Sequence, residues 1–101
     1  MVVDEMPEFP GGMKALMNYI SANVKYPESA KQAGLSGRVT TSFVVGEDGV
    51  IRDVKVLRGV SPDLDAEAIR VMSSMPKWTP GKQDGKPVPV RYAVPITFNG
   101  Q

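Results

Sequence analysis

The stretch GRVTTSFVVGEDGVIRDVKVL, residues 37–57, decides the fold expected for this chain. Apolar and polar residues alternate on both sides of a GEDG turn at residues 46–49, which is the pattern of a β-hairpin. The second strand puts Asp53 and Lys55 on its solvent side. The buried face of the first strand is expected to carry Val39, Thr41, Phe43 and Val45. One face of the sheet should therefore be covered by helices and the other should be wet.

Two helices are expected before the hairpin. Tyr26-Pro27 should end the first of them, because the residue before a proline is disfavoured in the α region. PESAKQAG, residues 27–34, predicts a short second helix with Gly34 at its end. The first helix begins near residue 13, and its buried stripe at helical spacing is expected to contain Met13, Leu16, Met17, Ile20 and Val24.

A third helix is expected after the hairpin, in SPDLDAEAIRVMSSM, residues 61–75. Ser61 is typical of an N-cap and Pro62 of the first helical position. The following segment, residues 77–88, is rich in Gly, Pro and Lys and is interpreted as a loop. The buried stripe of the helix is expected to contain Leu64, Ala68, Val71, Met72 and Met75. The acidic residues of its N-terminal part, which suit the helix dipole better than a catalytic or metal site, are Asp63, Asp65 and Glu67.

The closing segment VPVRYAVPITF, residues 88–98, alternates as a strand with its even-numbered residues toward the core. With the short helix left aside, the predicted order of long helices and strands is helix, strand, strand, helix, strand. This is an α+β fold, with a three-stranded antiparallel sheet and helices packed on one face. If the helical crossover sets the last strand beside the first, the order across the sheet is second, first, last, and the last strand lies at an edge.

Prolines constrain that edge. Pro87, Pro89 and Pro95 are all odd-numbered, and a proline in a strand is tolerated where its missing donor faces away from the ladder. The odd-numbered groups should then point outward, which leaves the N–H groups of Arg91, Ala93 and Thr97 unpaired. We hypothesise that an extended peptide adds to this strand, centred on residues 91–93. The alternative is an exposed edge without any partner.

Composition excludes several classes of function. The chain has 101 residues, no cysteine, no histidine and a formal charge of +1. It is long enough for one domain, which we place at residues 13–101, after the end of a linker at residues 1–12. The balance of charges argues against a nucleic-acid partner, and the loose basic run at residues 77–86 is interpreted as a solvated loop. Without a nucleophile–base pair or a ligand cluster, no enzymatic activity, cofactor or metal is expected. Trp78 and Tyr26 are interpreted as lids on the core, with recognition as the alternative.

Five motifs occur in a characteristic order: MPEFPGG, YPESAKQAGLSGRV, FVVGEDGVI, LDAEAIRVMSSMPKWTPG and GKPVPVRYAVPITF. Together they resemble the C-terminal domain of the TonB family, in the form seen in Bacteroidetes. The resemblance implies a periplasmic domain of an energy transducer, in a parent protein anchored to the inner membrane by an N-terminal helix that is absent here. It also implies two partners: an inner-membrane motor of the ExbB/ExbD type, reached through the missing region, and the TonB box of outer-membrane transporters.

The resemblance also implies the residues that bind the TonB box. In this family the box pairs as an added strand on the last strand of the domain. Here that strand contributes Val90, Arg91, Tyr92, Ala93, Val94, Ile96, Thr97 and Phe98. The stretch before the Tyr-Pro motif, which lies near the transporter in the family, corresponds to Asn23, Val24, Lys25 and Tyr26.

Two alternatives remain open at this point. The chain could be a TonB-like periplasmic module of a regulatory membrane metallopeptidase or another signalling protein. It could instead be a structural domain whose edge strand serves self-association. An edge-strand homodimer is also possible for a transducer domain, so a dimer alone does not distinguish a transducer from a structural self-association domain.

Overall fold

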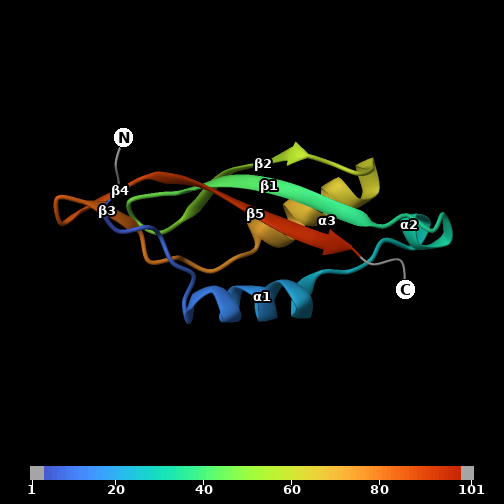
Figure 1. Ribbon diagram of the computed structural model, residues 1–101, viewed down its shortest axis with the longest axis horizontal. Helices are drawn as coiled ribbons and strands as arrows, with labels where there is room; N and C mark the ends of the chain where they lie inside the picture. Colours follow the sequence, from blue (N-terminus) through green and yellow to red (C-terminus); the bar gives the residue numbers. More distant parts are fainter. Residues whose placement is uncertain (1–3, 99–101) are drawn as a thin grey trace.

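The expected hairpin forms the centre of the fold. In the computed structural model, which describes residues 4–98, β1 (Gly37–Val45) pairs antiparallel with β2 (Ile51–Arg58) (Figure 1). The alternation in the sequence is confirmed, because Val39, Phe43 and Val45 are fully buried together with Thr41. Asp53 and Lys55 are exposed on the opposite face.

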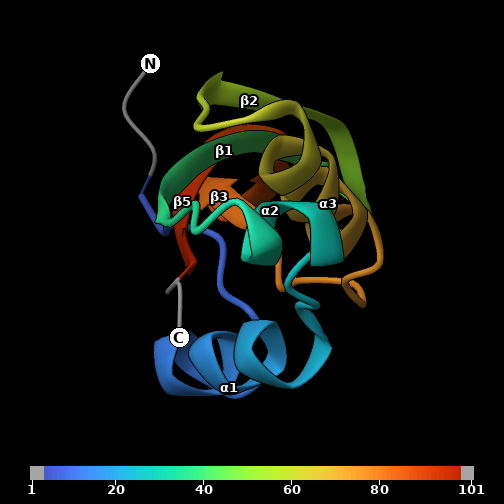
Figure 2. The same cartoon turned by 90° about the vertical axis from the view of Figure 1, so that its right-hand side faces the viewer.

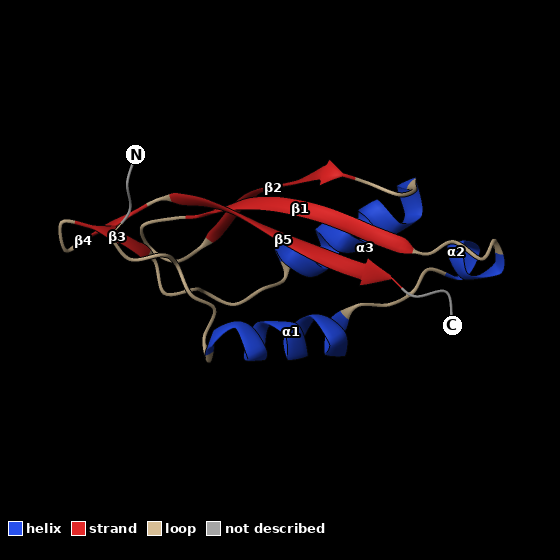
Figure 3. Cartoon of the chain, in the orientation of Figure 1, coloured by secondary structure: helices blue, strands red, loops and turns tan. Residues whose placement is uncertain are grey.

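β5 (Val90–Phe98) pairs antiparallel with the other side of β1, so the order across the sheet is β2-β1-β5. This is the predicted order, and it places the closing strand at an edge (Figure 3). Val94, Ile96 and Phe98 are buried, whereas the odd-numbered residues of β5 are exposed. The predicted orientation of the strand is therefore confirmed.

α3 (Pro62–Ser73) begins as its sequence predicts. The hydroxyl group of Ser61 accepts a hydrogen bond of 3.2 Å from the backbone N–H of Leu64, which satisfies one free donor of the first turn. The sheet arches over α3 (Figure 2), which packs against β1 and β2. All five residues of the predicted stripe are buried: Leu64, Ala68, Val71, Met72 and Met75.

α1 (Gly12–Asn23) and the short α2 (Glu28–Gln32) precede the sheet. Leu16 and Ile20 of α1 are buried, but Met13 and Met17 are 55% and 41% exposed, so the predicted stripe is too wide. The reason is that α1 lies at the periphery of the fold, below α3 and the sheet in Figure 2, so that only Leu16 and Ile20 of the predicted stripe are fully buried.

Residues 77–88 are not the plain loop that their composition predicts. They contain β3 (Gly81–Gln83) and β4 (Lys86–Val88), which form a two-stranded antiparallel hairpin. Asp84 and Gly85 connect the strands with φ angles of 53° and 77°. Positive φ at both central residues matches the right-handed twist of a tight hairpin, and an Asp-Gly pair favours it.

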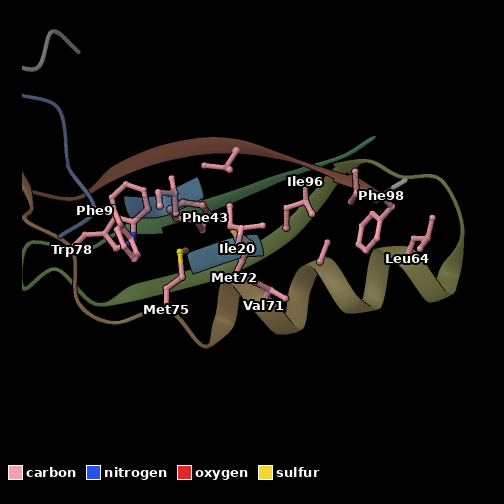
Figure 4. Close-up of a cluster of buried hydrophobic side chains, with 14 of the residues drawn as sticks. Phe9, Ile20, Phe43, Leu64, Val71, Met72, Met75, Trp78, Ile96 and Phe98 are labelled. Atoms are coloured by element: carbon pink, nitrogen blue, oxygen red, sulfur yellow. The ribbon is translucent and has the colours of Figure 1, made fainter. Parts of the chain in front are cut away.

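The N-terminal segment packs against this region. The N–H of Glu8 donates to the carbonyl of Thr79 at 3.0 Å. Glu5 and Lys82 form an antiparallel β-bridge through their backbone groups. Phe9 is 7% exposed and belongs to the hydrophobic core. The core runs from Phe9 and Trp78 at one end to Leu64 and Phe98 at the other (Figure 4).

Trp78 is buried as a lid on the aromatic end of the core, 4% exposed, with its ring 5.3 Å from that of Phe43. Within residues 4–98, no helix is long and apolar enough to cross a membrane. The same residues contain no group of three or more acidic side chains placed to hold a metal ion.

Candidate functional site

β5 uses only one of its two edges. β1 pairs with it continuously, from Gly37 opposite Phe98 to Val45 opposite Val90. Among the residues that the structure describes, no strand pairs with the other edge. In Figure 1, this edge lies on the side of β5 away from β1, along the length of the molecule. The backbone groups of this edge are therefore free to pair with a further strand.

Pro95 determines which backbone groups occupy that edge. It lies opposite Thr40, and opposed residues in an antiparallel pair alternate between hydrogen-bonded and non-bonded pairs. Because proline has no N–H, its pair with Thr40 must be the non-bonded kind, and the adjacent pair of Thr41 and Val94 must be the bonded one. Odd-numbered residues of β5 therefore direct their backbone groups outward. The outward N–H groups belong to Arg91, Ala93 and Thr97.

The other two prolines do not lie on this edge, and the expectation that all three mark one outward edge is wrong. Pro87 belongs to β4, where it lies opposite Lys82, and Pro89 lies between β4 and β5. The physical reason is the turn at residues 84–85, which folds this part of the chain onto β3 before β5 begins. Pro95 is thus the one proline within β5.

The side chain of Arg91 is held on the outer face of the sheet. Its guanidinium group donates to the hydroxyl of Ser42 in β1 and forms an ion pair with Asp53 in β2. The hydrogen bond from Arg91, with the charge of Lys55 nearby, holds the pKa of the Asp53 carboxyl below its usual value. The side chain of Arg91 is therefore engaged within the sheet, while its backbone N–H faces the open edge.

The segment from Asn23 to Tyr26 is linked to α3 through Glu67 and Arg70. The N–H of Lys25 donates to the Glu67 carboxylate, and the guanidinium of Arg70 donates to the carbonyl of Asn23 at 2.7 Å. Arg70 also donates to Glu67 at 2.7 Å. The hydrogen bonds that Glu67 accepts lower the pKa of its carboxyl group, and those from Arg70 have the larger effect. The side-chain amide of Asn23 donates a hydrogen bond to the carbonyl of Tyr19 in the same helix.

Tyr26 connects this segment to β5. Its ring packs edge-on against Phe98, with 5.9 Å between ring centroids. The structure thus brings the end of the segment next to the C-terminal end of β5. Asn23 and Lys25 contact α3 instead. The two groups of residues singled out in the sequence are neighbours at one end of the strand, and they do not form one continuous surface of side chains.

Two residues to which the sequence analysis gave no role, Arg38 in β1 and Arg58 in β2, line a shallow depression on the outer face of the sheet. Alternation along β1 places Arg38 on that face, opposite to Val39. Arg58 lies opposite Thr40, and this position depends on the register of β1 and β2, whose pairing has two irregularities.

Comparison of the sequence with protein families identifies a family that covers most of the chain. The family described as "Gram-negative bacterial TonB protein C-terminal" matches residues 22–99. A curated relative, Protein TonB of Helicobacter pylori, is 28% identical over 81 residues. The aligned region covers 79% of this chain and 27% of that protein, so the chain spans little more than a quarter of its relative.

Solved structures of TonB C-terminal domains have a similar fold. The NMR structure of the Helicobacter pylori TonB C-terminal domain superimposes with a TM-score of 0.65 at 25% identity, covering 87% of this chain and 92% of that one. The NMR structure of the Pseudomonas aeruginosa TonB C-terminal domain gives a TM-score of 0.56 at 29% identity, with coverage of 74% and 76%. The α+β architecture is thus shared with both.

Proposed function

This chain belongs to the family of Gram-negative bacterial TonB protein C-terminal domains, and we propose that it binds the TonB box of outer-membrane transporters as an added strand on β5. The observation that carries the proposal is the open edge of β5, whose other edge is fully occupied by β1. Addition of a strand to an exposed sheet edge is a recurrent mode of peptide recognition, in which main-chain hydrogen bonds supply affinity.

The number of available donors sets the expected strength. Arg91, Ala93 and Thr97 present outward N–H groups, and Pro95 interrupts the series. Each backbone hydrogen bond contributes about 0.5–1.5 kcal/mol net, so binding should be modest and reversible. Such binding suits one domain that serves several transporters, because recognition depends little on side chains.

Membership of the family supports the proposal of a larger role. In the parent protein the domain acts in the periplasm, and an inner-membrane motor of the ExbB/ExbD type supplies work through the region that precedes it. Tension on a paired strand loads several backbone hydrogen bonds together, which transmits force to the transporter. The role is mechanical, not enzymatic. The segment from Asn23 to Tyr26 contributes a second contact, beside Phe98 at the end of β5.

The direct test is an NMR titration of the isotopically labelled domain with synthetic TonB-box peptides from the same organism. We expect the largest amide shifts at Arg91, Ala93 and Thr97, with a smaller group at residues 23–26. If the amides of β5 stay unchanged while the peptide binds elsewhere, strand addition is wrong.

A pair of variants at one position isolates the backbone contribution. Ala93→Pro removes an outward donor and should weaken peptide binding about two- to tenfold, the loss of one backbone hydrogen bond. Ala93→Ser keeps the donor and should bind like the wild type. Pro95 already occupies an equivalent position, so the fold should accept a second proline, which circular dichroism will verify.

Modified peptides test the same point on the unaltered domain. An added strand directs alternate N–H groups toward β5, so N-methylation of residues of one parity should abolish binding and methylation of the other parity should not. Equal binding of both peptides would contradict the proposal.

A further inference from the structure

The outer face of the sheet carries a basic depression next to the C-terminal end of β5. It is open to solvent, has a volume of about 500 Å³, and is lined by Gly37, Arg38, Thr40, Arg58 and Thr97. These residues come from all three strands: Arg58 from β2, Arg38 from β1 and Thr97 from β5. Arg38 lies directly opposite Thr97. The depression therefore combines two guanidinium groups with two hydroxyl groups, a set of donors that suits a carboxylate.

The arginines of this depression differ from the others in the chain. Arg52, Arg70 and Arg91 each form an ion pair, with Asp48, Glu67 and Asp53 respectively. Within residues 4–98, neither Arg38 nor Arg58 has an acidic partner within 4 Å. Both are exposed, and their charges are therefore available to a ligand.

The same face of the sheet shows how far an arginine extends across strands. Arg91 extends from β5, over Ser42 in β1, to the carboxylate of Asp53 in β2. It spans two strand spacings, or about 10 Å, and contacts a hydroxyl group on the way. Arg38 would extend in the opposite direction, from β1 toward a strand added to β5. That strand would lie two spacings from β1, and the hydroxyl of Thr97 in β5 would lie between Arg38 and the added strand.

We propose that Arg38 binds an acidic side chain at one position of the added peptide, the position opposite Thr97 on the outer face of the sheet, and that Arg58, one strand further away, adds positive charge behind it. This inference rests on the proposed function, since the open edge of β5 holds the peptide in place. Hydrogen bonds to the edge supply general affinity, and Arg38 selects the register in which an Asp or Glu meets its guanidinium group. The depression thereby gives sequence preference to a contact made mainly through backbone groups.

The test is a set of synthetic TonB-box peptides in which all acidic residues are replaced by amides and a single Asp is placed at each position in turn. Affinities for the wild-type domain and for Arg38→Gln are measured by fluorescence anisotropy. We expect one position at which Asp improves the dissociation constant about three- to fivefold over Asn, the scale of an exposed ion pair. This improvement should disappear in Arg38→Gln and weaken with added salt.

Arg52→Gln is the matched control. It removes the same charge from the domain, but Arg52 is paired with Asp48 at the β1–β2 turn, away from the depression. It should preserve the preference for Asp. If Arg52→Gln abolishes the preference as well, the effect is one of net charge, and a specific site for an acidic side chain is wrong.

The remaining outcomes separate this inference from the proposed function. If peptides shift the amides of β5 but no position distinguishes Asp from Asn, the inference fails and strand addition stands. If no peptide shifts those amides, both fail. Vesicles of phosphatidylcholine with phosphatidylglycerol test a membrane surface as the anionic partner. Binding to them that requires Arg38 and Arg58, without an Asp preference in the peptides, would overturn the inference.

Discussion

Ser61 shows how much one hydroxyl group contributes at the scale of the residue. It accepts a hydrogen bond from the N–H of Leu64 at the start of α3, where no carbonyl of the helix is available to that donor. We expect Ser61→Ala to lower the free energy of unfolding by about 1 kcal/mol, measured by urea denaturation. Ser73→Ala, an exposed change in the last turn of the same helix, should have little effect. Equal losses in both variants would contradict a capping role.

Glu67 gives the fold a dependence on pH. Its side chain is 10% exposed and accepts hydrogen bonds from Arg70 and the N–H of Lys25, which lower its pKa in the folded state from an ordinary value of 4.5. The unfolded chain therefore binds the proton more tightly. The stabilisation is complete above pH 4.5 and is lost as the pH falls through the lower folded pKa.

Denaturation curves across that range test this dependence. Glu67→Gln should flatten the loss of stability between neutral pH and about pH 3, relative to the wild type. Arg70→Gln should have a similar effect, because it removes the first cause of the lowered pKa. An unchanged pH profile in both variants would show that Glu67 does not couple proton binding to folding.

At the scale of the element, local signals decide how well the sequence predicts the fold. The hairpin of β1 and β2 and the start of α3 have alternation or capping residues of their own, and they were predicted correctly. β3 and β4 were missed because Gly, Pro and Lys dominate their composition, although Asp84-Gly85 is a strong hairpin signal. Met13 and Met17 were placed in the core because helical periodicity gives the direction of a stripe and not its width.

The site was predictable to a similar degree. The position of β5 at an edge follows from the order of the elements, and the orientation of its donors follows from Pro95. The ion pair between Arg91 and Asp53 could not be predicted, because it spans three strands and depends on the irregularities in β1–β2 pairing. The depression at Arg38 and Arg58 depends on the same register.

The N-terminal segment behaves as an element of the core. Phe9 is 7% exposed, and its ring lies 5.5 Å from Tyr19 and 5.8 Å from Trp78. We expect Phe9→Ala to lower the free energy of unfolding by about 3–5 kcal/mol, the usual cost of removing a buried aromatic ring. Met6→Ala, at a residue that is 58% exposed in the same segment, is the control and should cost much less. A small effect of Phe9→Ala would mean that the segment is only loosely attached, as a linker would be.

At the scale of the whole molecule, the domain is an elongated body of 50 × 23 × 17 Å, with β5 running along its length (Figure 1). The open edge is therefore a long target for any extended chain, including a second copy of the domain. Pro95 limits that risk, because two β5 strands paired with each other would each lack a donor within the new ladder. We expect the domain to remain mainly monomeric in dilute solution, as sedimentation velocity will show.

Self-association at high concentration should compete with peptide binding, because both would use the N–H groups of Arg91, Ala93 and Thr97. A saturating TonB-box peptide should therefore convert any dimer to a 1:1 complex, and Ala93→Pro should prevent the dimer and weaken peptide binding together. Ala93→Ser, which keeps the donor, should leave both equilibria unchanged. A dimer that persists with peptide bound and in Ala93→Pro would have to form through another surface, and the edge of β5 would then be free for an added peptide in either oligomeric state.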